Sequence, residues 1–218
     1  MQDHGSSDHL NSSLTDLMTS LMVIFILLLL VFVSKTAAEI DVARELLLGD
    51  LNKTINPEQL PGLKVERDKK DRNAILVVVP ERLMNFQIGK SILSSGGQGF
   101  LQDYSPKLAS VICGTSHSDN VSSIVVEGYT DQFGYQNATA EQSENLNLKL
   151  SQDRAMEVVK QILSHLSGLN DRPCFLNKLS ASGRGQQDPQ ATPEESRRVV
   201  LKIRLRQADL QPVEQRLN

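Results

Sequence analysis

Asp16 is the one acid in a long apolar run, and an acid in that setting raises a question of chemistry. No charge interrupts the residues from Leu17 to Val33, and extending the run back to Ser13 gives 21 residues. At about 1.5 Å per residue this length spans roughly 30 Å, the thickness of a bilayer's hydrocarbon core. The sequence therefore predicts a transmembrane helix over residues 13–34, preceded by a head of residues 1–12.

A charged carboxylate at membrane depth is costly, and a protonatable group there can take up and release an ion. Thr15, Thr19 and Ser20 lie beside Asp16 or about one turn away, so their hydroxyl groups are candidates for lining a polar path. The alternative is an acid at the membrane interface that caps the helix N-terminus, where negative charge is favoured. Position alone leaves both interpretations open.

The flanks of the apolar run bear on processing and orientation. Residues 1–16 contain no Lys or Arg, so the basic region of a cleaved signal peptide is missing. The first basic residue is Lys35, which follows the helix. By the positive-inside rule alone, a basic residue after the helix would place the C-terminal side in the cytoplasm.

Composition excludes several classes of function. The net charge is −3 and the pI is near 5.8, which disfavours nucleic acid as a partner. The two cysteines match no zinc or CxxC spacing, so we expect no metal and no cofactor. The histidines stand at positions 4, 9, 117 and 165, without a nucleophile arrangement or a phosphate loop, so we expect no enzyme activity.

Residues 35–63 predict a stalk that ends in a linker. Ile40, Ala43, Leu47 and Leu51 recur at helical spacing, and "NPEQLPGL" then breaks any helix with two prolines and a glycine. A simple spacer is the interpretation that this pattern favours. A domain of residues 64–206 and a tail of residues 207–218 complete the expected organisation.

The domain alternates strands and helices. Amphipathic patterns predict helices over 99–113 and 151–166, and for the latter Ser151 stands at the N-cap position with Asp153 in the first turn. Runs rich in β-branched residues or alternating in polarity predict strands at 73–80, 122–128, 175–182 and 197–206. This order indicates an α/β (α+β) sandwich, with helices on one face of a small mixed sheet.

Four ordered blocks of this domain resemble the OmpA-like peptidoglycan-binding family. They are "VVEGYTDQFG", "NLKLSQDRA", "LSASGRGQQDP" and "RRVVLKI", within a match over roughly residues 73–206. The resemblance implies noncovalent binding of the diaminopimelate-containing peptide of the cell wall. It also implies the ligand-contacting positions, which are Asp131, Asn147 and Arg154, with Thr130 beside them and Arg198 as the arginine of the last strand.

The chemistry of these residue types suits such a ligand. Diaminopimelate carries an ammonium, which Asp131 can neutralise, and a carboxylate, which suits the forked donors of Arg154. Arg154 would also lie in the first turn after Ser151, where free backbone N–H groups favour an anion. Taken singly, Asp131 could instead fix a turn, and Arg154 could be a solvated helix residue. Two features depart from the family: Tyr129 stands where histidine is usual, and a longer stretch separates Asp131 from Asn147.

Wall binding implies a periplasmic domain and a cytoplasmic N-terminus, against the weak basic bias. The periplasm is oxidising, which makes the cysteines informative. Cys113 ends the first predicted helix of the domain, and Cys174 precedes the third strand. A right-handed arrangement places both at the entry side of strands, so we predict a Cys113–Cys174 disulfide, with two free buried thiols as the alternative.

A short head, one helix that begins with an acid, and an OmpA-like domain together resemble the MotB family of ion-driven stators. "TDLMTSLMVIFILLLL" is similar to that family's membrane motif, with Asp16 at the proton-carrying position. The resemblance implies a homodimer, a multi-helix MotA-like partner, and H⁺ rather than Na⁺ as the ion in a bacterial inner membrane.

The brief stalk and the acidic head resemble most the MotB-like subunit (ZorB) of the Zorya anti-phage defence systems. Three alternatives stay open: a flagellar stator for motility, a passive wall tether without ion flux, and a TolR/ExbD-like energiser. The last is disfavoured because the periplasmic domain of that family differs.

Overall fold

The computed structural model falls into two compact units, Met1–Asp41 and Val42–Asn218. It describes residues 5–56, 58, 60–87 and 89–206, with only the backbone described for residues 5–13 and 35–40. The expected tail of residues 207–218 and the first four residues of the expected head lie outside the described residues.

The first unit consists of the N-terminal part of helix α1, which runs over Gly5–Ile55. Its Leu14–Ser34 segment has a mean hydropathy of 2.9 and, among the described residues, is the one helical segment long and apolar enough to cross a membrane. The side chains of this segment are exposed. Residues 5–12 of the expected head are helical and belong to α1.

The C-terminal part of α1 belongs to the second unit, which differs from the predicted stalk. Leu47, Leu51 and Ile55 are buried in the hydrophobic core of that unit. The predicted helical spacing is therefore correct, but the apolar stripe covers the core of the domain rather than forming a free spacer. The helix ends at Ile55, as the proline- and glycine-containing segment predicts.

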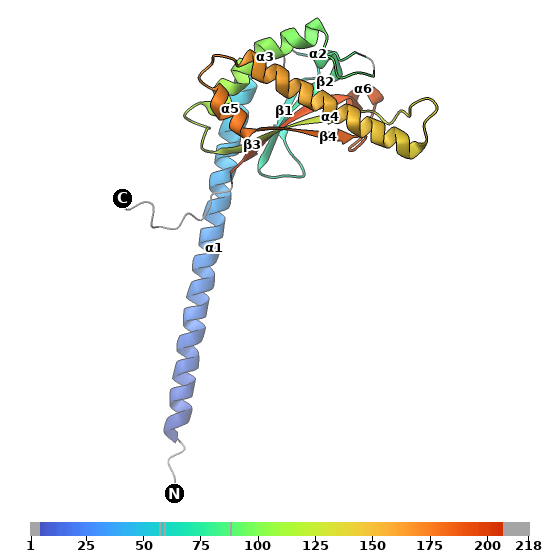
Figure 1. The fold of residues 1–218 in the computed structure, drawn as a ribbon. Helices are drawn as coiled ribbons and strands as arrows, with labels where there is room; N and C mark the ends of the chain where they lie inside the picture. Colours follow the sequence, from blue (N-terminus) through green and yellow to red (C-terminus); the bar gives the residue numbers. More distant parts are fainter. Residues whose placement is uncertain (1–4, 57, 59, 88, 207–218) are drawn as a thin grey trace. The chain divides into compact units, whose positions relative to one another are not determined.

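A mixed five-stranded sheet forms the centre of the second unit (Figure 1). The strands are β1 Lys64–Arg67, β2 Ala74–Pro80, β3 Val121–Tyr129, β4 Leu179–Gly185 and β5 Arg198–Leu205, in the spatial order β1-β2-β5-β3-β4. β3 and β4 are parallel and the other pairs are antiparallel. Three predicted strands match β2, β3 and β5. The short, charged β1 was not predicted.

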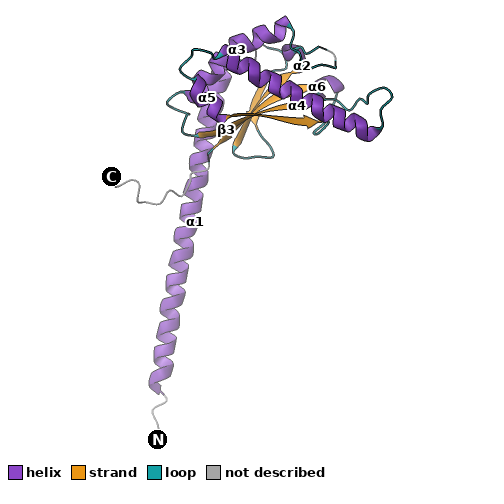
Figure 2. Ribbon diagram, viewed as in Figure 1, coloured by secondary structure: helices purple, strands orange, loops and turns teal. Residues whose placement is uncertain are grey.

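Helices α3, α4 and α5 lie on the same side of the sheet (Figure 2), so the predicted fold class is confirmed. The helices of the second unit after α1 are α2 Glu81–Met84, α3 Ser95–Cys113, α4 Ala140–His165, α5 Arg172–Lys178 and α6 Pro193–Ser196. Because residues 172–178 form α5, the third predicted strand begins later than expected. Alternate residues of β5, such as Val199, Leu201 and Ile203, are buried in the core.

Helix α4 begins at Ala140, so the predicted start at Ser151 was wrong. Thr139 is the N-cap and forms a capping box with Gln142, which satisfies the first backbone donors. Ser151 lies in the middle of α4, where its hydroxyl donates to the carbonyl of Leu148 (2.7 Å) and accepts from the N–H of Gly185 (2.8 Å). Arg154 is therefore far from the N-terminus of α4. The free backbone N–H groups of the first turn are too distant to help bind an anion next to Arg154.

The predicted Cys113–Cys174 disulfide is confirmed. It joins the end of α3 to α5, across a sequence separation of 61 residues and a Cα–Cα distance of 6.0 Å. Phe175, which follows Cys174, is fully buried in the core. The disulfide thus anchors the chain at the point where it enters β4.

Gly128 allows α4 to pack directly on β3. A Cβ atom at Gly128 would lie 2.2 Å from the backbone oxygen of Ser151, a distance that only backbone movement could relieve. We expect Gly128→Ala to lower the free energy of unfolding by about 1–3 kcal/mol or more, measured by urea denaturation.

Gly99 supplies the matched control, because it lies within α3 and a Cβ there would meet nothing within 4 Å. Gly99→Ala should be neutral or stabilising by up to about 1 kcal/mol. Equal unfolding free energies for the two variants would contradict the close packing of α4 on β3.

Candidate functional site

Charged residues from four elements converge at one end of the sheet. Pro80 of β2 pairs with Arg198 of β5, and Gly128 of β3 pairs with Val199 of β5, so these strands reach the same edge. The first residues beyond the strands lie at this edge. Glu81 follows β2, Thr130 and Asp131 follow β3, and Arg197 precedes β5.

Asp131 is fixed by the backbone and by an arginine. Its Oδ1 accepts from the N–H of Phe133 (3.2 Å), and its Oδ2 accepts from Nη1 of Arg197 (2.6 Å). The first bond is the local turn contact that the sequence left open as an alternative role. The second places the carboxylate in an ion pair within a larger cluster, so the turn contact is only part of its environment.

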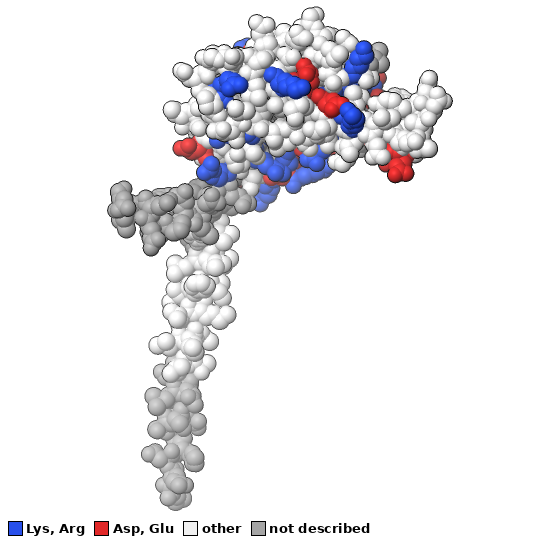
Figure 3. Space-filling view, viewed as in Figure 1, with Lys and Arg blue, Asp and Glu red and all other residues white. Residues whose placement is uncertain are grey.

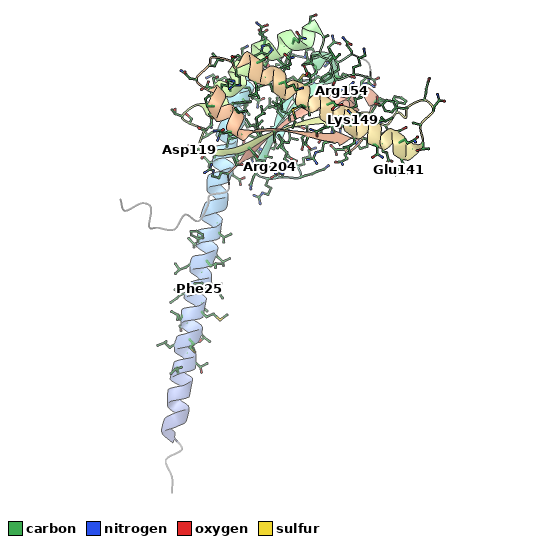
Figure 4. The ribbon with its side chains drawn as sticks, viewed as in Figure 1. Phe25, Asp119, Glu141, Lys149, Arg154 and Arg204 are labelled. Carbon is green, nitrogen blue, oxygen red and sulfur yellow. A yellow bond between two sulfur atoms is a disulfide. The ribbon has the colours of Figure 1, made fainter. Side chains whose placement is uncertain are left out.

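Arg154 lies about midway along α4 and is buried, with 6% of its side chain exposed (Figure 4). Its Nε donates to the carbonyl of Lys90 (3.1 Å), its Nη1 lies 3.6 Å from Oε1 of Glu81, and its guanidinium stacks 4.9 Å from the ring centre of Phe86. Burial lowers the pKa of Arg154, and the charges of Glu81 and Asp131 oppose that shift. This environment differs from that of a solvated helix residue.

Glu81 and Arg197 connect these two residues into one chain of charges. Nε of Arg197 donates to Oε2 of Glu81, and the N–H of Glu81 donates to the carbonyl of Arg197 (3.1 Å). We call the four side chains, in the order Asp131, Arg197, Glu81 and Arg154, the charge quartet. Burial alone would lower the pKa of Arg197, but hydrogen bonds to Asp131 and Glu81 raise it above its usual value.

Thr130 and Asn147 flank the quartet. The hydroxyl of Thr130 is buried and has no hydrogen-bond partner among the described residues. Asn147 is also buried, and its Nδ2 donates to the carbonyl of Phe133 (3.1 Å). Asn147 therefore holds the loop after β3, whereas Thr130 keeps an unused polar group at the groove.

Arg198 lies apart from the quartet. Its guanidinium stacks 4.1 Å from the ring centre of Tyr129 and donates to Asp188 Oδ2 (3.0 Å). Tyr129 donates to Glu127 (2.8 Å), and burial together with that hydrogen bond raises the pKa of Tyr129. Of the two adjacent arginines, Arg197 rather than Arg198 pairs with Asp131. The sequence shows the arginine doublet, but it does not show which of the two arginines pairs with Asp131.

A groove of about 1670 Å³ joins these features. It is lined by the whole quartet, Thr130 and Asn147, and it continues along the sheet face opposite the core helices, past Val200 and Lys202. Figure 3 shows Lys and Arg beside Asp and Glu over α4, so the charges of this visible face are mixed. Among the described residues, no three metal-binding side chains are grouped to hold a metal ion.

Asp16 belongs to the first unit. Because the described part of α1 begins at Gly5, Asp16 lies beyond the first turn of the helix and is not its N-cap. The hydroxyl of Thr19 donates to the carbonyls of Thr15 and Asp16, both at 2.9 Å. Asp16 and Ser20 are exposed on the helix.

The fold and the groove define a small α/β domain with a charged groove, which follows an apolar helix in the sequence. Residues 85–199, just over half of the chain, match the OmpA family, and the chain belongs to that family. A comparison with curated proteins gives no match.

Solved structures share the fold. A putative MotB-like protein from Desulfovibrio vulgaris is 18% identical with a TM-score of 0.54, covering 78% of this chain and 99% of that one. A periplasmic domain of Helicobacter pylori MotB is 19% identical with a TM-score of 0.53, covering 73% and 90%. Another MotB periplasmic domain is 18% identical with a TM-score of 0.51, covering 72% and 75%.

Proposed function

We propose that the chain is a peptidoglycan-anchored subunit of an ion-driven rotary motor in the bacterial inner membrane. The observation that carries the anchoring role is the charge quartet, which brings Asp131 and Arg154 to one groove beside the unpaired hydroxyl of Thr130. Both residues are held by neighbours, so their charges are oriented before a ligand arrives. Preorganised polar groups of this kind are typical of binding sites.

The ligand is the diaminopimelate-containing stem peptide of the cell wall. Its side-chain ammonium binds Asp131, whose Oδ1 accepts only a backbone N–H among the described residues. Its carboxylate binds Arg154, whose Nη2 donates to no described acceptor. Asn147 supports the loop, Thr130 supplies a further hydrogen bond, and Arg198 holds the neighbouring sheet face. The protein binds its ligand without catalysis.

The domain lies in the periplasm and the N-terminus lies in the cytoplasm. The Cys113–Cys174 disulfide supports an oxidising compartment, and the similar MotB domains are themselves described as periplasmic. The Leu14–Ser34 segment crosses the membrane once. Lys35 then lies on the outer side, against the usual bias of positive charge, because the folded domain decides the orientation.

Asp16 carries the transported ion. One helix cannot enclose an ion path, so a homodimer of this chain works with a multi-helix MotA-like membrane partner. Thr19 and Ser20 line the polar path, and the ion is H⁺. The motor serves anti-phage defence, as in the Zorya systems, whose MotB-like subunit this chain most resembles. Motility and a passive tether are the alternatives that the second experiment below separates.

We expect Asp131→Asn and Arg154→Gln each to weaken peptidoglycan binding by roughly tenfold or more, because each removes one charge-assisted contact. The measurement is co-sedimentation of the detergent-solubilised chain with purified cell-wall sacculi. Lys149→Gln is the matched control, since Lys149 lies on the same helix with 72% of its side chain exposed and should leave binding unchanged. Wild-type binding by both site variants would contradict the proposed anchor.

We expect Asp16→Asn to abolish proton influx and biological output while leaving expression and sacculus binding unchanged, because an amide cannot cycle a proton. Influx is measured with a cytoplasmic pH dye in cells carrying the native gene neighbourhood, beside phage plating and swimming assays. Ser34→Ala, at the other end of the apolar segment, is the control. Full activity of the Asp16→Asn variant would contradict ion transport by Asp16 and favour a passive wall tether. If the variant lost swimming but kept phage resistance, the result would indicate a role in motility.

A further inference from the structure

We propose that Glu81 and Arg197 set the selectivity of the groove for ligand groups that carry both a positive and a negative charge. This inference rests on the proposed function, since it concerns the same groove. It assigns a role to two residues outside the ligand-contacting set that the sequence predicts.

The signs along the quartet alternate. Asp131 is negative, Arg197 positive, Glu81 negative and Arg154 positive, and each neighbouring pair is in contact: 2.6 Å from Asp131 to Arg197, a hydrogen bond from Arg197 to Glu81, and 3.6 Å from Glu81 to Arg154. The sum is zero. Glu194 also lies 3.4 Å from Arg197, but 74% of its side chain is exposed, so solvent weakens its contribution.

Glu81 and Arg197 keep the two ends of the chain available. If Asp131 and Arg154 paired directly, each would neutralise the other and close the site. Instead, Arg197 takes Oδ2 of Asp131 and Glu81 lies at Nη1 of Arg154. Oδ1 of Asp131 and Nη2 of Arg154 remain for a ligand.

A zwitterionic ligand group completes the pattern. Its ammonium beside Asp131 and its carboxylate beside Arg154 turn the open chain into a ring of six charges, in which every neighbour has the opposite sign. A group with only a carboxylate brings a second negative charge near Asp131 without an ammonium to separate them, and a group with only an ammonium brings a second positive charge near Arg154 without a carboxylate. Like-charge contacts of this kind discriminate against the wrong partner.

The backbone makes the middle of the chain rigid. Glu81 directly follows β2 and Arg197 directly precedes β5, where Pro80 and Arg198 are paired in the sheet. The N–H of Glu81 also bonds to the carbonyl of Arg197 (3.1 Å). The central pair therefore stays in place when a ligand binds at the two ends.

The test measures affinities of the full chain in detergent by isothermal titration calorimetry. The probes are a soluble stem peptide with diaminopimelate, the same peptide with the side-chain amine acetylated, which leaves an anionic group, and the same peptide with the side-chain carboxylate amidated, which leaves a cationic group. The wild type should prefer the zwitterion. Glu81→Gln should shift the ratio toward the anionic peptide, and Arg197→Gln toward the cationic peptide, each by roughly tenfold.

Two control variants separate selectivity from a general effect of charge or folding. Glu66→Gln removes one exposed carboxylate from the same groove and should leave the ratios unchanged. Arg197→Lys keeps the charge and should keep the wild-type ratios. Thermal unfolding of each variant identifies loss of structure.

Tight wild-type binding with unchanged ratios in Glu81→Gln and Arg197→Gln would overturn this inference and leave the proposed function intact. Loss of cooperative unfolding in both variants would make the pair structural, which also overturns it. Failure of the wild type to bind any stem peptide would overturn the proposed function and the inference together.

Discussion

The carboxylate of Glu81 lies between two guanidinium groups, and the end of the sheet depends on that arrangement. It contacts Arg154 at 3.6 Å and accepts a hydrogen bond from Arg197. Without it, the buried guanidinium of Arg154 and the partly exposed guanidinium of Arg197 would face each other with no negative charge between them. The quartet takes one residue each from the start of α2, the loop after β3, α4 and the chain before β5. A single electrostatic cluster thus joins four elements that are distant in sequence.

The fold could be predicted largely because its strands obey simple patterns. The β-branched run of β2 and the alternation at the end of β5 follow from burial against the core, which selects apolar residues at those positions. The start of α4 was missed because Ser151 was interpreted as the N-cap residue. In the structure its side chain is buried and accepts a hydrogen bond from the N–H of Gly185, so tertiary contacts override its local preference. Thr139 and Gln142, three residues apart, were the available signal for the true start.

The site could be predicted only in part, for a related reason. Asp131 and Arg154 stand in recognisable motifs, but the sequence does not show which of the two adjacent arginines, both of which line the groove, pairs with Asp131. That choice is set by the register of β5 against β2 and β3, which one sequence does not reveal. Glu81 carries no motif signal, and its role follows from the pairing of the strands on either side of it.

The charged groups of the two units differ in how they are compensated. In the globular unit every member of the quartet has a partner of opposite sign within the chain. Asp16 instead lies on an apolar helix beyond its first turn, where a charge is expensive in a membrane and no helix end compensates it. This cost is the reason that the proposed function includes a membrane partner around the helix.

The central claim is that Asp131 and Arg154 receive the two charges of one ligand group. The most direct measurement is an NMR titration of the globular unit with two stem peptides, one with diaminopimelate and one with lysine, which lacks the second carboxylate. The account predicts saturable shifts at Thr130, Asp131 and the Arg154 Nε–H with the first peptide, and much weaker ones with the second. Equal responses to both peptides, or shifts confined to Arg184 and Lys202 on the open sheet face, would contradict it.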